Sequence, residues 1–460
     1  VAILSRNSME NAESYFSIPN AGLVLVMLNF RLAPPELLTI LADAGVSALM
    51  VHEGFLDALN QIRNQLGFVR HFILIGNISP PDGWHSYERL IEASPSDEPL
   101  VDLNERDLAA LMYTSGTTGA PKGCMAIHHN FHYVGQSMSQ EMGTRMEDRG
   151  IITTPLFHAS GEVVLMNGIY SATTTIIMPH WDVMEFMTLV EKYRISTGVL
   201  ATPMLLYLLN CPNIDDFDLK SLRKVIFAGA PVTPEIFRNA IERFGNIFVH
   251  GFGTTETLGS ICMLGTGDIA KALALGNTEI LGSCGKAYTG MDVEVVDEWD
   301  NPVPPDQSGE IRTRGPGMTE GYWQKTTETR KVFRDGWFYT GDLCRVDRNG
   351  FMYIVGRKKD VIITGAENVY PVEVENVLHK HPDVFDASVT GLANSNWGEI
   401  VTAFVVTQAN SRITAEQLIS FCREEIAGYK VPKKIYFVDS LPRSATGKVL
   451  KYKLKEKYAS

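Results

Sequence analysis

The chain has 460 residues, of which 41 are Lys or Arg and 53 are Asp or Glu, so its formal net charge is −12. Hydrophobic residues make up 45% and charged residues 20% of the chain, which excludes a disordered, collagen-like or coiled-coil protein. The acidic balance argues against nucleic acid as the main partner, and no apolar run reaches the roughly 18 residues of an integral membrane segment. At roughly 150 residues per domain, the length predicts more than one domain.

Helical and strand patterns alternate over the first three quarters of the chain. Apolar spacing predicts a helix over 35–44 that stops at Gly45, followed by short buried strands over 46–51 and 72–75. The alternation continues with helices over 184–193, 204–209 and 234–244 and with strands over 108–112, 198–201, 224–227 and 247–250. Strands separated by helices of this length predict βαβ units and parallel sheets, and hence an α/β fold.

Past about residue 281 the pattern changes. Short strands are predicted over 293–296, 309–313 and 351–355, joined by turns rich in Pro, Gly and Asp, which indicates an antiparallel sheet or a small barrel. The acidic part of the chain ends near Gly356, and the residues after it carry a small excess of positive charge. We therefore predict a large domain over 1–356, with a β-rich subdomain over about 281–356, and a smaller α+β domain over 357–460.

The cysteines and the N-terminus bear on the cellular compartment. The six cysteines are scattered, without a C-x-x-C pair or the His spacing of a zinc site, so we expect reduced core thiols rather than a disulfide framework. The N-terminus lacks a basic segment followed by an apolar stretch and a cleavage site, and a cytoplasmic protein is expected. Because the chain starts inside a strand predicted over 1–4, without an initiator Met, we interpret it as lacking an N-terminal piece.

The strongest chemical signal is the run Y-T-S-G-T-T-G-A-P-K-G at residues 113–123. Its glycines allow tight turns that bring backbone N–H groups close to an anion, and its hydroxyl groups and Lys122 add donors and positive charge. The run therefore has the composition of a phosphate-binding loop. It is not a Walker A motif, because Lys122 is followed by Gly123 rather than by Ser or Thr. On composition alone, an ordinary flexible loop is the alternative.

This run resembles the signature of the acyl-adenylate-forming superfamily, which includes acyl-CoA synthetases, 4-coumarate–CoA ligases, luciferases and the adenylation domains of peptide synthetases. Further motifs resemble those of the family in the same order along the chain: F-G-T-T-E at 252–256, W-F-Y-T-G-D at 337–342, G-R-K-K-D at 356–360 and P-R-S-A-T-G-K at 442–448. The resemblance covers essentially the whole chain. It implies an ATP-dependent enzyme that joins an organic acid to AMP and then transfers it to a thiol.

The resemblance assigns nucleotide-binding roles to many of these residues. Those of the phosphate loop are Thr114, Ser115, Gly116, Thr117, Thr118, Gly119 and Lys122. Those around adenine are the turn of Gly229, Ala230 and Pro231, the stacking residue Phe252, and its neighbours Gly253 and Thr254. Asp342 would accept both ribose hydroxyls with its two carboxylate oxygens, assisted by Arg357.

The catalytic roles implied by the resemblance are mostly positioning and charge stabilisation. Thr255 would hydrogen-bond the phosphates, and Glu256 would hold Mg²⁺ on them, since Mg²⁺ is usually bound through one or two protein carboxylates and phosphate oxygens. Lys448 would offset the charge that develops around the α-phosphate. Rotation of a mobile C-terminal domain about a hinge at Lys359 would then exchange Lys448 for a thiol channel lined near Gly365.

The acid and the acceptor are predicted from a few positions. His158 stands where amino-acid-activating relatives carry Asp, and it resembles the CoA-ligase form, in which the ring lies near the carboxylate and the thiol. Gly253 stands where acetate-type enzymes place a Trp, so we expect an open acyl channel; other lining candidates are Met204, Ala228 and Leu258. A medium- or long-chain fatty acid is favoured, with an aryl acid as the alternative. Because no carrier domain follows Lys448 in this chain, free coenzyme A is the expected acceptor.

The predicted function is thus that of an AMP-forming acyl-CoA synthetase that uses ATP, Mg²⁺ and coenzyme A. A luciferase-like or 4-coumarate-type ligase is the alternative within the family. An ATP-binding kinase or ATPase is an alternative from another class, and it would release ADP and phosphate instead of AMP and pyrophosphate. A non-catalytic nucleotide-binding relative is a further alternative, but the presence of Glu256, Asp342 and Lys448 together argues against it. The expected partners are small molecules, with no nucleic acid and no integral membrane segment, and a homodimer is the assembly to be tested.

Overall fold

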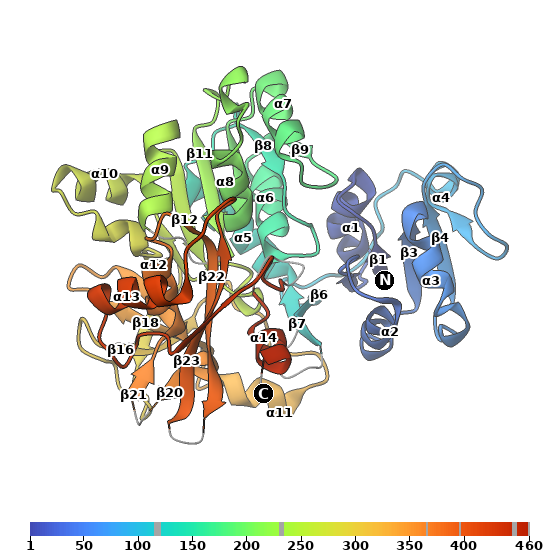
Figure 1. The fold of residues 1–460 in the computed structure, drawn as a ribbon. Helices are drawn as coiled ribbons and strands as arrows, with labels where there is room; N and C mark the ends of the chain where they lie inside the picture. Colours follow the sequence, from blue (N-terminus) through green and yellow to red (C-terminus); the bar gives the residue numbers. More distant parts are fainter. Residues whose placement is uncertain (115–120, 230–233, 365–366, 395–396, 444–448, 459–460) are drawn as a thin grey trace.

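The computed structural model describes residues 1–114, 121–229, 234–364, 367–394, 397–443 and 449–458. Its strands form two large sheets with helices packed on them, a smaller antiparallel sheet, and a C-terminal region built around a sheet of its own (Figure 1). This arrangement confirms the predicted α/β fold with a β-rich part and an α+β C-terminal region.

The first sheet has the strand order β5-β4-β3-β1-β2-β6-β7, and its neighbouring strands are parallel except β6 with β7. The strands are β1 (Ala2–Leu4), β2 (Leu25–Met27), β3 (Ala48–His52), β4 (His71–Ile75), β5 (His85–Ser86), β6 (Leu108–Thr114) and β7 (Lys122–Ile127). The helices are α1 (Met9–Asn20), α2 (Pro34–Asp43), α3 (Leu56–Asn60) and α4 (Tyr87–Ala93). The central strands are continuous buried apolar runs, as in parallel sheets generally, and the elements predicted in this part are present with slightly shifted ends.

The second sheet has the strand order β14-β13-β12-β11-β10-β8-β9, and only the pairs that involve β13 are antiparallel among its described strands. The strands are β8 (Arg149–Ile152), β9 (Thr174–Ile177), β10 (Thr197–Ala201), β11 (Lys224–Ala228), β12 (Phe248–Phe252), β13 (Cys262–Leu264) and β14 (Lys286–Ala287). The helices are α5 (His128–Met142), α6 (Ala159–Tyr170), α7 (Val183–Tyr193), α8 (Thr202–Leu209), α9 (Pro234–Phe244) and α10 (Thr266–Ala274). The predicted parallel arrangement is therefore confirmed here as well.

The two large sheets meet at the carboxyl ends of β1 and β8. Asn7, which follows β1, donates its amide to the carbonyl oxygen of Thr154 at 3.0 Å and accepts from the backbone N–H of Leu156 at 2.8 Å. Helix α5 also touches α6, because a Cβ added at Gly135 would lie only 2.9 Å from the carbonyl oxygen of Met166. Open α/β sheets bind ligands at the carboxyl ends of their strands, so this junction is where a site is expected.

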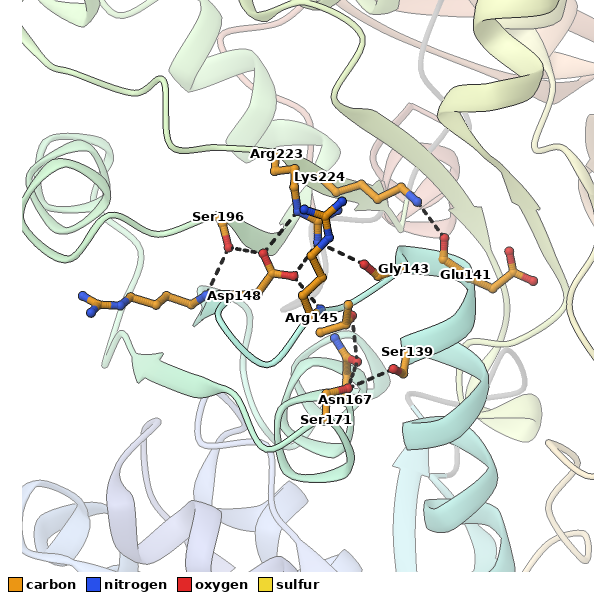
Figure 2. A network of polar contacts seen from close by, with 12 residues as sticks. Ser139, Glu141, Gly143, Arg145, Asp148, Asn167, Ser171, Ser196, Arg223 and Lys224 are labelled. Carbon is orange, nitrogen blue, oxygen red and sulfur yellow. Dashed lines mark hydrogen bonds and ion pairs between the residues drawn. The ribbon is translucent and has the colours of Figure 1, made fainter.

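A polar network stabilises the second sheet at the amino ends of its strands, opposite the carboxyl ends, in the residues just before β8, β10 and β11 (Figure 2). The Asp148 carboxylate accepts from the Arg223 guanidinium at 3.2 Å, from the Ser196 hydroxyl at 2.7 Å and from the backbone N–H of Arg145 at 2.8 Å. Burial by itself would raise the pKa of Asp148, but these donors and the charge of Arg223 hold it below its ordinary value. Arg223 also donates to the carbonyl oxygen of Gly143, so the network ties the end of α5 to the sheet.

The third sheet is antiparallel and follows the order β15-β16-β18-β17, with β19 paired to β18. Its strands are β15 (Asp292–Val296), β16 (Ser308–Arg314), β17 (Phe333–Arg334), β18 (Trp337–Val346) and β19 (Met352–Arg357), and it carries the helix α11 (Thr326–Val332). The antiparallel pairing expected from the short, turn-rich strands past residue 281 is confirmed.

The C-terminal region contains a sheet of order β21-β20-β23-β22, and β24 is parallel to β23. Its strands are β20 (Ile362–Thr364), β21 (Glu367–Val369), β22 (Val384–Asn394), β23 (Gly398–Thr407) and β24 (Lys434–Phe437), and its helices are α12 (Pro371–Leu378), α13 (Ala415–Glu425) and α14 (Lys451–Tyr458). It has a hydrophobic core of its own, which includes Val374, Val389 and Leu418. Arg357 is the last residue of β19, and the division into domains at 356 and 357 stays a prediction.

Two further expectations concern cysteines and membranes. All six cysteines lie in the described part of the chain, where each is a free thiol and five of them are buried. Across the residues that the structure describes, no helix has both the length and the apolar character needed to cross a membrane.

Candidate active site

The base of the 113–123 run is held by two antiparallel strands. Thr114 ends β6, Lys122 begins β7, and the two residues face each other in register. The Lys122 ammonium lies 4.9 Å from the centroid of the Tyr322 ring, which is a cation–π contact. The other loop residues of the prediction, Ser115, Gly116, Thr117, Thr118 and Gly119, lie outside the described residues, and their roles stay predictions.

Contacts that sequence reasoning missed anchor this base. The Tyr113 hydroxyl donates to Oδ2 of Asp43 at 2.7 Å, and the Lys325 ammonium donates to Oδ1 of the same carboxylate at 2.6 Å. Burial and the hydrogen bond to Asp43 raise the pKa of Tyr113, so its hydroxyl remains a donor at neutral pH. Asp43 ends α2 and Lys325 precedes α11, and no local pattern marks residues so far apart in sequence as partners.

The loop after β12 folds back tightly on itself. Phe252 ends β12, Thr254 caps a single 3-10 turn (Thr255–Thr257), and Leu258 adopts a positive φ of 47°. A Cβ added at Gly253 would lie 2.2 Å from the backbone of Gly259. This close approach by itself requires glycine at position 253, so it accounts for Gly253 without reference to the acyl channel, whose length stays a prediction.

Glu256 lies in the 3-10 turn of that loop and is held at two points. Its Oε1 accepts from the Tyr322 hydroxyl at 2.7 Å, and its backbone carbonyl accepts from the N–H of Thr319 at 2.9 Å. Among the described residues, no group of three or more His, Cys, Asp or Glu side chains is placed to hold a metal ion. A lone carboxylate fits a Mg²⁺ ion that takes its remaining ligands from phosphates and water.

Asp342 and Arg357 are brought together by the pairing of β18 with β19, in which they are opposite each other. Arg357 donates from Nε to Oδ1 of Asp342 at 2.9 Å, and the Asp342 side chain is 6% exposed. The Thr340 hydroxyl accepts a hydrogen bond from the backbone N–H of Asp342 at 3.0 Å, which fixes the turn. The predicted ribose-binding pair is therefore assembled in the structure, although its role toward ribose stays a prediction.

His158 caps the N-terminus of α6, at the junction of the two large sheets. Its Nδ1 accepts from the backbone N–H of Ser160 at 3.2 Å and lies 2.9 Å from the Ser160 hydroxyl. Burial, together with the nearby charge of Arg31, lowers the pKa of His158 to about 4, so the ring is neutral at pH 7. Because Nδ1 accepts a hydrogen bond, Nε2 carries the proton and is available as a donor.

The remaining pocket candidates divide between two hydrophobic clusters. Ala228, at the end of β11, and the buried Leu258 belong with the cluster that contains Ala159 of α6. Met204 packs instead against the cluster on the other side of the second sheet, with Phe237. Gly229 follows β11 with a φ of +91°, whereas Ala230 and Pro231 lie outside the described residues.

The C-terminal candidates lie at the edges of what the structure describes. Lys359 is exposed in the short 3-10 turn (Lys358–Asp360) between β19 and β20, where a hinge would be placed. Gly365 and Lys448 lie outside the described residues. Arg443 and Val449, which flank the segment of Lys448, form an antiparallel bridge with each other.

Known proteins and protein families are similar to this chain over nearly its whole length. A family model described as AMP-binding enzyme matches residues 1–323, and one described as AMP-binding enzyme C-terminal domain matches residues 373–448. A feruloyl-CoA synthase from Amycolatopsis sp is 35% identical over 462 residues, which cover 100% of this chain and 88% of that protein. A long-chain-fatty-acid–CoA ligase from Mycobacterium tuberculosis is 32% identical over 461 residues, with coverages of 100% and 88%.

A solved structure agrees with these relatives. An anthranilate CoA ligase in complex with anthranoyl-AMP superposes with a TM-score of 0.91 and 27% identity, covering 99% of this chain and 86% of that one. These similarities confirm the predicted enzyme class, an AMP-forming acid–thiol ligase, and the predicted use of ATP and coenzyme A, whereas Mg²⁺ stays a prediction that fits the family. The individual site residues and a homodimer stay predictions. The chain therefore belongs to the AMP-binding enzyme family, in its branch of CoA ligases.

Proposed function

We propose that this protein joins a carboxylic acid to coenzyme A through an acyl-adenylate formed from ATP. The observation that supports the proposal most is the contact of Glu256 with the base of the 113–123 run through Tyr322. This contact places the carboxylate suited to Mg²⁺ one side chain away from Lys122, near the end of the run suited to phosphates. Two motifs that are distant in sequence thereby form one nucleotide site.

In the first step, an oxygen of the acid attacks the α-phosphorus of ATP, and the bond from that phosphorus to pyrophosphate breaks. Lys122 attracts the phosphates, and Asp342 accepts hydrogen bonds from the ribose, so the nucleotide is held for attack in line. Glu256 would hold Mg²⁺, which neutralises phosphate charge when bound. Lys448 would stabilise the charge that grows at the α-phosphate.

His158 would orient the acid. A neutral imidazole that donates from Nε2 binds a carboxylate oxygen without pairing with it as a cation, so the carboxylate keeps its nucleophilic charge. In the second step, the thiol of coenzyme A attacks the acyl carbon, and the bond from that carbon to AMP breaks. The same Nε2 would then face the carbonyl oxygen on which negative charge develops.

The acid proposed first is aromatic. The feruloyl-CoA synthase and the anthranilate CoA ligase are named for aryl acids, and both match the chain over nearly its whole length. A medium- or long-chain fatty acid is the second candidate, because the mycobacterial relative is a long-chain-fatty-acid–CoA ligase at 32% identity. The tight loop at Gly253 does not distinguish between these two acids.

A product assay over a panel of acids tests the proposal. The protein is incubated with ATP, Mg²⁺, coenzyme A and single aryl or fatty acids, and the nucleotide products are separated by chromatography. AMP, pyrophosphate and an acyl-CoA are expected with one class of acid, and neither AMP nor acyl-CoA without an acid. ADP and phosphate instead of AMP and pyrophosphate would refute the proposal and indicate a kinase or an ATPase.

A further inference from the structure

Tyr322 lies between two groups of the candidate site that carry opposite charges. Its hydroxyl donates to Oε1 of Glu256 at 2.7 Å, and its ring centroid lies 4.9 Å from the Lys122 ammonium. The residue is only 6% exposed.

The backbone around Tyr322 is hydrogen-bonded both to the strand that begins with Lys122 and to the loop that contains Glu256. Tyr322 forms an antiparallel bridge with Cys124 of β7, and the N–H of Trp323 donates to the carbonyl oxygen of Gly123 at 2.8 Å. On the other side, Thr319 donates both its N–H and its hydroxyl to the backbone carbonyl of Glu256. The segment 319–323 therefore fixes the distance between the base of the 113–123 run and the loop of Glu256.

This geometry keeps an attractive pair of charges apart. A Lys and a carboxylate in a partly buried site attract each other strongly, and a direct ion pair would use both the cation that phosphates need and the oxygens that a metal needs. Within the described part of the chain, no ion pair joins Lys122 to Glu256. The neutral Tyr322 hydroxyl binds one carboxylate oxygen, and the ring face attracts the ammonium without neutralising it.

We infer that Tyr322 is a positioning residue that holds Glu256 ready for the metal and Lys122 ready for the triphosphate. The inference rests on the proposed function, because it gives these two residues the roles that the function requires. Hydrogen-bond partners of metal ligands typically contribute 10- to 100-fold to metal affinity. Tyr322 would do so through Glu256 without touching the metal.

The test is the binding of Mn²⁺ together with α,β-methylene-ATP, an analogue whose α–β bridge cannot release pyrophosphate. The Tyr322→Phe variant keeps the ring and the cation–π contact and removes only the hydroxyl. We expect Mn²⁺ to bind the complex of the Tyr322→Phe variant with α,β-methylene-ATP about 10- to 100-fold more weakly than the same complex of the unaltered protein, as measured by isothermal titration calorimetry. The affinity of the variant for the nucleotide without metal should change little. Tyr87→Phe is the matched control, since it removes another tyrosine–glutamate hydrogen bond, to Glu13 at 2.8 Å, and its Mn²⁺ affinity is expected to be unchanged.

A double-variant cycle separates positioning from general loss of structure. In a Glu256→Gln background, Tyr322→Phe is expected to cause no further loss of Mn²⁺ affinity, because the residue acts through Glu256. A further loss of Mn²⁺ affinity in that background would overturn the inference. So would equal Mn²⁺ affinities of the Tyr322→Phe variant and the unaltered protein. The inference would also fail if the variant lost as much affinity for the metal-free nucleotide as for Mn²⁺. If the unaltered protein binds no nucleotide at all, the proposed function itself fails and takes the inference with it.

Discussion

Replacement of Glu162 by Gln is expected to change how stability depends on pH. Glu162 lies in the first turn of α6 and is 0% exposed, and its two carboxyl oxygens have no hydrogen-bond partner among the described residues. Burial therefore raises the pKa of Glu162 well above its ordinary value of 4.5. The folded protein keeps this proton at pH values where the unfolded chain has lost it.

The sign and size of the effect follow from linkage. Above about pH 4.5 the unfolded state binds fewer protons at this position than the folded state, so the free energy of unfolding falls as the pH rises. Each pH unit costs about 1.4 kcal/mol for as long as the folded protein keeps the proton. Between pH 5 and pH 7 the loss is at most about 2–3 kcal/mol, which is reached when the folded protein keeps the proton over the whole range. Gln, which has nearly the same shape and does not titrate, avoids this loss.

Urea unfolding of the Glu162→Gln variant and the unaltered protein at pH 5, 6 and 7 measures this loss. The stability of the variant relative to the unaltered protein should rise from pH 5 to pH 7, by at most about 2–3 kcal/mol, whatever the constant offset between the two. Glu242→Gln, at an exposed position of α9, serves as the control and should show a much smaller trend. A flat difference for Glu162→Gln would refute the reasoning, because it would mean that the folded protein ionises Glu162 as readily as the unfolded chain.

Three further outcomes are expected. Asp148→Ala leaves the partly buried Arg223 without its carboxylate and should lower the free energy of unfolding in urea by about 2–3 kcal/mol; a change below about 0.5 kcal/mol would contradict the network in Figure 2. Asp342→Ala should raise the KM for ATP about tenfold or more in a pyrophosphate-release assay while the KM for the acid stays constant, because the acceptor of the ribose hydroxyls is lost; equal changes in both would speak against that role. Lys448→Ala should slow ATP–pyrophosphate exchange by roughly 10²- to 10³-fold, and unchanged exchange would remove Lys448 from the first step.

The sequence by itself determined the family and the kinds of element. Helix 35–44 and strands 72–75 and 224–227 are found at nearly the predicted positions, because apolar periodicity and turn residues act over a few neighbouring positions. The run at 113–123 and the motif at 252–256 likewise carry their composition within a short stretch. Such local signals are enough to identify an α/β ligase of the AMP-binding family.

Only the tertiary structure decided which distant residues touch. The contacts of Tyr322 with Glu256 and of Asp43 with Tyr113 depend on strand order and on the return of a late segment to β7, and no local spacing encodes these. The structure also shows a steric reason for glycine at position 253, because a side chain there would collide with the backbone of Gly259. The sequence had suggested a different reason, an open acyl channel. Local patterns are written in neighbouring residues, whereas a site assembled from several strands exists only after the sheets have formed.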